Sequence, residues 1–268
     1  MPENRNIAVK IRFLGSRFHG FQRQKNAVTI QEIIENALFK ILGQETVIFG
    51  CSRTDKGVSA IEYVFSFKTE NAISLYKLKG ALNHFLPDEI AVFDLCEVNE
   101  DFHARYSCIE KEYKYIIRNT RQKDPFVDGR VCRYGISYLD EEMLSREAKS
   151  FLGRHDFSAF CSVNDGAKSH IREIRAAEVT REGDDVIFTF RADGFLYNMV
   201  RIMVGTLVFI NEGKIKEGSI PDIIKGKDRG KAGQTAEAEG LYLSKVFYQN
   251  NPFENSETEG TQWQKSKK

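Results

Sequence analysis

The chain has 268 residues and a net charge of +1 at pH 7, with 41% apolar and 29% charged residues. This composition is typical of a soluble globular protein with one large domain or two small ones. Because the net charge is close to zero, it provides no argument for nucleic-acid binding. The five cysteines form no Cys-x-x-Cys pair and no metal-ligand spacing with histidine, so we expect reduced thiols, a cytoplasmic location and no metal. The longest apolar run, 195–210, is too short to span a bilayer and contains Asn198 and Arg201, which predicts a core helix.

Strand and helix patterns alternate along the first half of the chain. They predict strands at 6–14, 46–50, 61–67 and 90–98, and helices at 30–42 and 75–85. Thr29 and Glu32 have the spacing of a capping box at the start of the first helix, and Ser74 is the expected cap of the second. The resulting order, β-α-β-β-α-β, is that of the ferredoxin-like split motif, which common RNA-binding modules also use.

The second half repeats this order loosely. Its patterns predict strands at 111–118, 172–180, 185–192 and 241–248, and helices at 140–152, 195–211 and 220–226. We therefore predict an α+β fold of two ferredoxin-like halves, with joined, mainly antiparallel sheets and a central active-site cleft. The expected halves are 1–104 and 105–249, and a polar tail at 250–268 is expected to be disordered.

A basic stretch lies near the N-terminus. Between Asn4 and Gln31 there are six cations and no acidic residue, and Phe13, Phe18 and Phe21 are interleaved with them. Cations neutralise phosphate and aromatic rings stack on bases, so this stretch is a candidate RNA-binding surface. A solvated edge strand with its loop would give the same pattern.

Residues 51–57, Cys-Ser-Arg-Thr-Asp-Lys-Gly, allow two interpretations. Asp-Lys-Gly is a good turn, because Asp binds its own backbone and glycine tolerates positive φ. Alternatively, Asp55 is an ionised nucleophile that is held on a tight turn between the cations Arg53 and Lys56.

Three further features bear on this choice. Arg201 lies in the most apolar predicted helix, so it either reaches water at the helix end or pairs with a carboxylate such as Asp55 and keeps it charged. Tyr113 lies on a predicted strand, where it either packs in the core or stacks on a base and moves a proton. Arg105, in the segment 101–107 between the halves, either contacts phosphate or holds that segment in place.

Four blocks, RTDKGVSA, FHARYSCIEKEYKYII, DGFLYNMVRIMVGTL and KDR..AG.TAEAEGLYL, resemble the tRNA pseudouridine synthase A family (TruA). The resemblance spans residues 5–248 in the family's order and implies the pseudouridine synthase fold. It also implies a homodimeric enzyme that isomerises uridine to pseudouridine at positions 38, 39 and 40 of the tRNA anticodon stem-loop, with no cofactor and no metal.

The resemblance also assigns residues. It implies that Asp55 is the nucleophile, that Tyr113 stacks on the target base and accepts a proton, and that Arg201 pairs with Asp55 and keeps its pKa low. The residues expected to bind substrate are Arg53, Tyr113, Leu241, Gln22, Arg23 and Arg105.

The sequence departs from the usual family pattern beside the nucleophile. Ser52, Lys56 and Ser59 replace Gly, Ala and His, and Phe21 replaces a Trp, so these changes bear on which uridines are modified. A non-catalytic RNA-binding protein with tandem ferredoxin-like modules is the main alternative, and a hydrolase with Asp55 as nucleophile is a second. The sequence also leaves open whether Asp55 would attack the ribose or the base.

Overall fold

A ten-stranded sheet runs through the computed structural model, which describes residues 4–163 and 166–254. Its strands are β1 (Arg5–Phe13), β2 (Phe49–Gly50), β3 (Ser59–Thr69), β4 (Ile90–Val98), β5 (Cys108–Arg118), β6 (Cys132–Arg133), β7 (Gly153–Asp156), β8 (Ile171–Glu182), β9 (Asp185–Ala192) and β10 (Leu241–Tyr248). The order across the sheet is β4-β1-β3-β10-β5-β9-β8-β7, with β2 on β3 and β6 on β5. Among the strand pairs of the described residues, only β3–β10 and β5–β6 are parallel, so the predicted mainly antiparallel α+β fold is confirmed.

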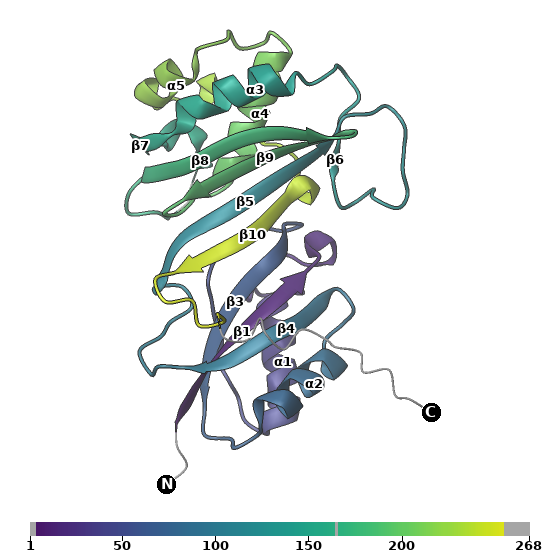
Figure 1. Cartoon of the computed structure of the whole chain (residues 1–268), viewed down its shortest axis with the longest axis vertical. Coiled ribbons are helices and arrows are strands. Elements are labelled where there is room, and N and C mark those ends of the chain that lie inside the picture. Colours follow the sequence, from purple (N-terminus) through teal and green to yellow (C-terminus); the bar gives the residue numbers. More distant parts are fainter. Residues whose placement is uncertain (1–3, 164–165, 255–268) are drawn as a thin grey trace.

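The helices are α1 (Ile30–Leu42), α2 (Leu75–Phe85), α3 (Glu141–Ala148), α4 (Met199–Asn211) and α5 (Ile220–Gly226). Figure 1 shows α1 and α2 behind β4, β1 and β3, and α4 behind β8 and β9. The order of elements in the first half is the predicted one, and Ser74 caps α2 by accepting a hydrogen bond from Lys77 N at 3.4 Å. The strand expected at 46–50 shrinks to Phe49–Gly50, because Ile48 N donates to the Glu35 carboxylate at 3.3 Å instead of to a strand.

The predicted capping box at the start of α1 does not form. The Thr29 hydroxyl makes no capping hydrogen bond, and its oxygen is buried without a partner. Backbone carbonyls of the preceding loop take its place: Ile30 N donates to Gly20 O at 3.3 Å, and Gln31 N donates to Phe21 O at 2.9 Å. The helix end therefore holds this loop against α1.

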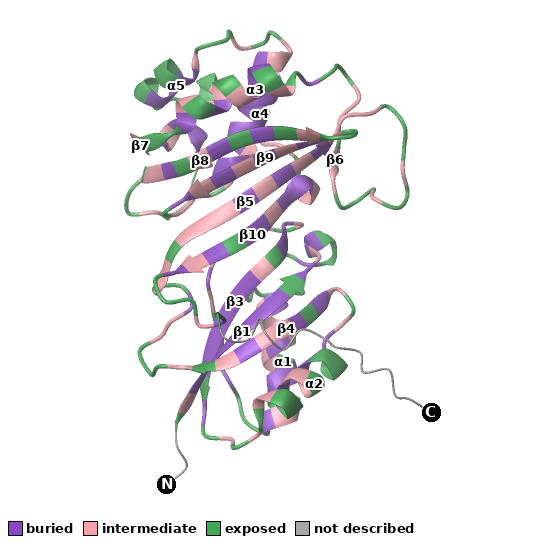
Figure 2. Ribbon diagram, in the orientation of Figure 1, coloured by how far each residue is buried: buried purple, intermediate pink, exposed green. Residues whose placement is uncertain are grey.

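The most apolar helix is shorter than expected. The pattern predicted a helix over 195–211, but α4 begins at Met199, because Asn198 adopts a left-handed conformation with φ of 60°. Ten of the thirteen residues of α4 are buried. Figure 2 shows its ribbon largely in purple, the colour of buried residues. Arg201 lies in the first turn of this helix, close to its N-terminal end. Within the described ranges, no helix is long and apolar enough to cross a membrane.

The last strand joins the two sides of the sheet. β10 lies between β3 and β5, with Leu243 opposite both Ala60 of β3 and Tyr113 of β5. The start of β3, which follows the Asp55 turn, is therefore brought beside the strand that carries Tyr113. The predicted boundary at 104/105 falls between β4 and β5 and remains a prediction.

The described chain continues past β10. Phe253 is 1% exposed, and its ring lies 4.6 Å from Lys10 Nζ. The tail expected from residue 250 therefore includes an ordered, packed turn, because an apolar side chain there covers a buried cation. The rest of that tail, 255–268, lies outside the described residues.

Candidate active site

Asp55 lies on a tight turn between β2 and β3. Val58 N donates to Asp55 O at 3.1 Å, and Gly57 has a φ of +83° that favours glycine. The turn that the sequence predicted is therefore present. Its geometry fixes the backbone of Asp55, which both interpretations of this segment require.

A neighbouring loop supports this turn through backbone contacts. A Cβ atom on Gly15 would lie 2.1 Å from Val58 O, and one on Gly20 would lie 2.5 Å from Thr54 O. Phe21 N donates to Thr54 O at 3.1 Å. The two glycines thus allow the loop to pack directly on both sides of Asp55, so small displacements of the turn are resisted.

The charge of Asp55 is controlled by two opposing effects. Burial raises the pKa of its carboxyl above the ordinary value of 3.8, and the positive charge of Arg201 lowers it by a smaller amount. The expectation that Arg201 keeps this pKa low is therefore wrong for the protein alone, because desolvation is the larger effect. Arg53 and Lys56 do not contribute to the shift, since both side chains are exposed and water screens their charges.

Arg201 is held by neutral partners. Its Nε donates to Ala236 O at 2.6 Å, and a terminal nitrogen donates to Asn198 Oδ1 at 2.8 Å. Among the described residues, it forms no ion pair of 4.0 Å or less with Asp55. The structure therefore brings the two charges into interaction without direct contact, and the predicted pair remains a prediction for the bound state.

The segment 233–238 lies within one of the four blocks that carry the family resemblance, but its connection of Arg201 to the Asp55 turn was not predicted. Ala236 N donates back to Arg201 O at 3.1 Å, and a Cβ on Gly57 would lie 3.0 Å from the Cβ of Ala238. One signal was available: Gly205 is a helix-breaking residue inside α4. A Cβ on it would lie 1.8 Å from Gln234 O, so this glycine lets the segment approach the helix.

Tyr113 is buried beside the Asp55 turn. It is 6% exposed, burial raises the pKa of its hydroxyl, and its ring packs edge-on against Phe195 at 5.1 Å between centroids. The Ser52 and Tyr113 hydroxyls are 3.2 Å apart. Ser52, which stands where glycine is usual in the resembling family, therefore connects the loop that carries Asp55 to β5.

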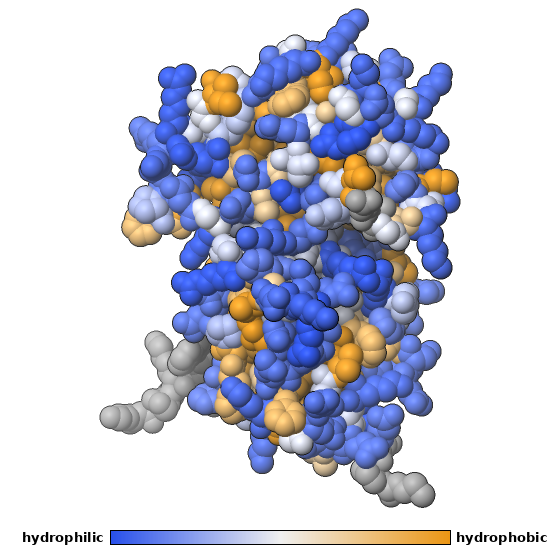
Figure 3. Space-filling view, turned by 180° about the vertical axis from the view of Figure 1, so that it is seen from behind, coloured by the Kyte–Doolittle hydropathy of each residue, from blue (hydrophilic) through white to orange (hydrophobic). Residues whose placement is uncertain are grey.

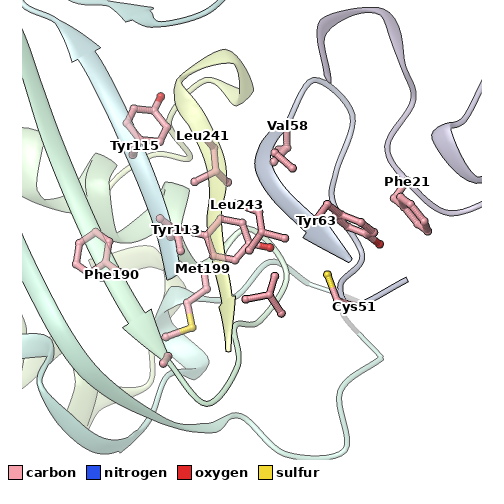
Figure 4. Packing of buried hydrophobic residues seen from close by; sticks show 14 of the residues in the cluster. Phe21, Cys51, Val58, Tyr63, Tyr113, Tyr115, Phe190, Met199, Leu241 and Leu243 are labelled. Atoms are coloured by element: carbon pink, nitrogen blue, oxygen red, sulfur yellow. The ribbon is translucent and has the colours of Figure 1, made fainter. Parts of the chain in front are cut away.

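Figure 4 shows Tyr113 and Leu243 on adjacent strands, facing the loop of Cys51 and Val58. Leu241, two residues before Leu243 on β10, is 6% exposed and pairs with Tyr115. Both residues expected to surround the target base are thus present on neighbouring strands. Burial raises the pKa of the Cys51 thiol to about 12, so this cysteine is protonated at neutral pH and is a poor nucleophile.

The other predicted substrate-binding residues lie on the surface. Arg53, Gln22 and Arg105 are exposed. Arg23 is half-exposed and forms an ion pair of 3.1 Å with Glu35. These four residues are therefore accessible to a large ligand, and their roles remain predictions.

The N-terminal basic stretch is not an aromatic stacking surface. Phe13, Phe18 and Phe21 are at most 5% exposed, because they point into the core. Several of its cations pair with carboxylates from elsewhere, for example Arg17 with Glu89 at 2.6 Å. Figure 3 shows the molecule from behind the view of Figure 1, and on that face mostly hydrophilic side chains surround small apolar patches.

Two cavities, of about 790 and 550 Å³, lie away from these residues: the larger is lined by parts of α4, α5 and 226–232, and the smaller lies beside 97–109 and 248–252. Neither is lined by Asp55, Tyr113 or Arg201, so the predicted central cleft is not one of them.

Within the described ranges, no group of three or more His, Cys, Asp or Glu residues is placed to hold a metal ion. The structure brings the Asp55 carboxylate near the Arg201 guanidinium and near the Tyr113 hydroxyl.

Comparison with known proteins gives consistent results. A family model described as tRNA pseudouridine synthase matches residues 9–107 and 148–249. The tRNA pseudouridine synthase A of Thermoanaerobacter sp. (strain X514) is 45% identical over 245 residues, which cover 91% of this chain and 100% of that protein. The proteins of the same name from Acetivibrio thermocellus and Clostridium acetobutylicum are 44% and 41% identical, again over 91% of this chain and 100% of theirs.

Proposed function

We propose that Asp55 is the nucleophile with which this chain, a member of the tRNA pseudouridine synthase family, isomerises uridine. The chain is an enzyme, an isomerase that acts on tRNA. The observation that supports the role of Asp55 is its carboxylate, which is fixed on a braced turn, partly desolvated and subject to the charge of Arg201. A turn residue with a purely structural role has no need of a cation carried on a helix of the other side of the sheet.

The reaction requires no change of oxidation state. The bond from ribose C1′ to uracil N1 breaks, the base turns, and a bond forms from C1′ to C5. The proton lost from C5 is balanced by the proton gained at N1. The Asp55 carboxylate supplies the electron pair for a covalent step, at C1′ of the ribose or at C6 of the base, and is released at the end.

Tyr113 is the proposed base-stacking residue and proton acceptor. It is positioned by Ser52 and Phe195 on the strand beside the Asp55 turn, and Leu241 is the proposed wall of the base pocket. The target nucleotide must leave its stack to reach these residues, which costs a few kcal/mol. Contacts of Arg53, Gln22, Arg23 and Arg105 with the RNA are proposed to offset this cost.

We further propose the finer assignments that the sequence resemblance implies. These are modification at positions 38, 39 and 40 of the anticodon stem-loop, action as a homodimer in the cytoplasm, and two halves, 1–104 and 105–249, with Asp55 in the first. The close similarity to proteins named tRNA pseudouridine synthase A over 91% of the chain supports them. Mapping of modified positions in tRNA from a deletion strain, with and without the gene, tests the target assignment.

The first experiment is tritium release from tRNA transcripts labelled at uracil C5, with uridines at 38–40. Release by the wild-type protein and none by Asp55→Ala supports both the reaction and the nucleophile. Release by both proteins would reject Asp55 as nucleophile. Binding without release by either would favour the non-catalytic RNA-binding alternative.

The single-turnover rate should depend on pH through Asp55. The carboxylate must be ionised to react, and burial raises its pKa, so the rate should fall on acidification at a pH above the ordinary value of 3.8. Arg201 lowers this pKa, and Arg201→Gln should therefore move the acidic limb to higher pH. A limb that stays in place in the Arg201 variant would remove Arg201 from this role.

Binding of tRNA should weaken steeply with salt. Arg53 is exposed beside Asp55, and Arg53→Ala should lower the slope of log K against log salt concentration by about 1, which is the effect of losing one phosphate contact. Arg17, which pairs with Glu89, provides the matched control, and Arg17→Ala should leave the slope unchanged. Equal slopes for wild type and Arg53→Ala would place Arg53 outside the RNA interface.

A further inference from the structure

Arg229 lies in the turn between α5 and the segment 233–238, and the mechanism above does not use it. We propose that Arg229 is a positioning residue for the reaction: it fixes the segment 233–238, which in turn holds Arg201 at its distance from Asp55. This inference rests on the proposed roles of Asp55 and Arg201. It adds a residue that touches neither the nucleophile nor the cation beside it.

The guanidinium of Arg229 donates hydrogen bonds to uncharged acceptors. One terminal nitrogen donates to Gly233 O at 2.9 Å, and the other donates to Thr235 Oγ1 at 3.4 Å. It forms no ion pair among the described residues, and burial lowers its pKa. A half-buried guanidinium without a carboxylate partner carries a desolvation cost, so its two hydrogen bonds to one short segment indicate a specific use.

The segment that Arg229 holds is also packed tightly on α4. Gly233 N donates to Thr206 Oγ1 at 2.8 Å, and a Cβ on Gly233 would lie 2.4 Å from Gly205 O. The backbones of the helix and the segment are therefore in direct contact. Since no side chain separates them, a displacement of the segment at Gly233 is transmitted along it.

The far end of the segment reaches the catalytic residues. Ala236 exchanges two hydrogen bonds with Arg201: the side chain of Arg201 donates to Ala236 O at 2.6 Å, and Ala236 N donates to Arg201 O at 3.1 Å. Tyr115 OH donates to Glu237 O at 2.7 Å, and Ala238 lies against Gly57 of the Asp55 turn. Arg229 is thus connected to Arg201 through seven residues of chain, both ends of which are held by hydrogen bonds.

The planar fork of arginine suits this task. Its two terminal nitrogens reach acceptors two residues apart, on Gly233 and Thr235, and fix both the position and the direction of the segment. Lysine would keep the charge but lose the fork. If the segment loosens, the hydrogen bond from Arg201 to Ala236 loosens with it, and the charge of Arg201 lowers the pKa of Asp55 less effectively.

The test measures single-turnover tritium release against pH for Arg229→Gln, Arg229→Lys and Thr235→Val, together with tRNA affinity and thermal melting. For Arg229→Gln we expect the acidic limb to move to higher pH, with a rate on that limb that is about 10-fold lower, the order expected for lost hydrogen bonds from a charged donor. The rate should recover at high pH, and affinity should stay within about twofold of wild type. Arg229→Lys and Thr235→Val should shift the limb less, in the same direction.

Arg181 is the matched control. It is also a partly buried arginine of the second half that donates to a backbone carbonyl, Leu139 O, but it contacts Glu141 instead of the segment 233–238. Arg181→Gln should leave the limb in place. A rate lowered equally at all pH values in Arg229→Gln, or an unchanged profile in all three variants, would overturn the proposal. If Arg201→Gln also fails to move the limb, the proposed role of Arg201 fails; if only the Arg229 variants fail to move it, only this inference fails.

Discussion

Asp55→Ala is expected to lower the single-turnover rate of pseudouridine formation by at least about 10⁴-fold, because no other group in the site replaces the lost nucleophile. Burial raises the pKa of Cys51 to about 12, and it raises the pKa of the Tyr113 hydroxyl as well, so neither is a ready substitute. Affinity for tRNA should change by no more than about twofold, since phosphate contacts dominate such interfaces. Tritium release and filter binding measure the two quantities on the same protein preparation.

The same substitution should raise stability at neutral pH. The folded-state pKa of Asp55 lies above its unfolded value, so ionisation costs the folded protein free energy, and stability falls as pH rises between the two values. Removing the carboxyl removes this cost, and the melting temperature at pH 7 should increase. Asp184, an exposed residue of the β8–β9 turn, provides the control, and Asp184→Ala should retain full activity. Loss of activity together with lower stability in Asp55→Ala would point to a structural role of the turn.

Gly205→Ala is expected to disrupt the site from a distance. The new Cβ would lie 1.8 Å from the carbonyl oxygen of Gln234. Because this oxygen belongs to the backbone, it cannot relieve the clash by a rotamer change as a side chain could. We expect the free energy of unfolding to fall by about 1–3 kcal/mol, and the single-turnover rate to fall by about 10-fold or more as Ala236 moves away from Arg201. Chemical denaturation and tritium release measure the two effects.

Gly80 provides the matched control for this substitution. It also lies inside a helix, α2, but a Cβ on it meets nothing within 4 Å. Gly80→Ala should raise the free energy of unfolding by about 0.5–1 kcal/mol, because alanine loses less backbone entropy than glycine in a helix, and activity should not change. If the two variants change stability and activity alike, Gly205 is not required for the close approach of the segment 233–238 to α4.

Local patterns were enough to predict most of the fold. The period of apolar residues located α1 and α2, each of which buries one face, and apolar runs located the long strands, so the order of elements followed directly. Predictions failed where a distant group decides the local structure. At the start of α1, the carbonyls of Gly20 and Phe21 accept the hydrogen bonds of the first backbone N–H groups in place of the Thr29 side chain. The strand before Gly50 is shortened because Ile48 N donates to the Glu35 carboxylate.

The candidate site was predictable in its residues but not in its electrostatics. Asp55, Tyr113 and Arg201 could be chosen from motifs, and the structure brings them to one region of the sheet. The net direction of the pKa shift of Asp55 depends on how much water the fold excludes, which no spacing of residues encodes. The phenylalanines of the basic stretch pointed to stacking on bases, whereas the fold uses them as core.

The position of β10 has a consequence for the timing of synthesis. A chain leaving the ribosome exposes Asp55, then Tyr113 and Arg201, well before Leu241–Tyr248. Yet β3 and β5 are neighbours only through β10, which lies between them and pairs with both. Until that strand emerges, the carboxylate and the tyrosine belong to separate pieces of sheet. A nascent chain that ends before β10 therefore carries Asp55, Tyr113 and Arg201 without the strand that joins β3 to β5, and we expect it to be unable to modify RNA.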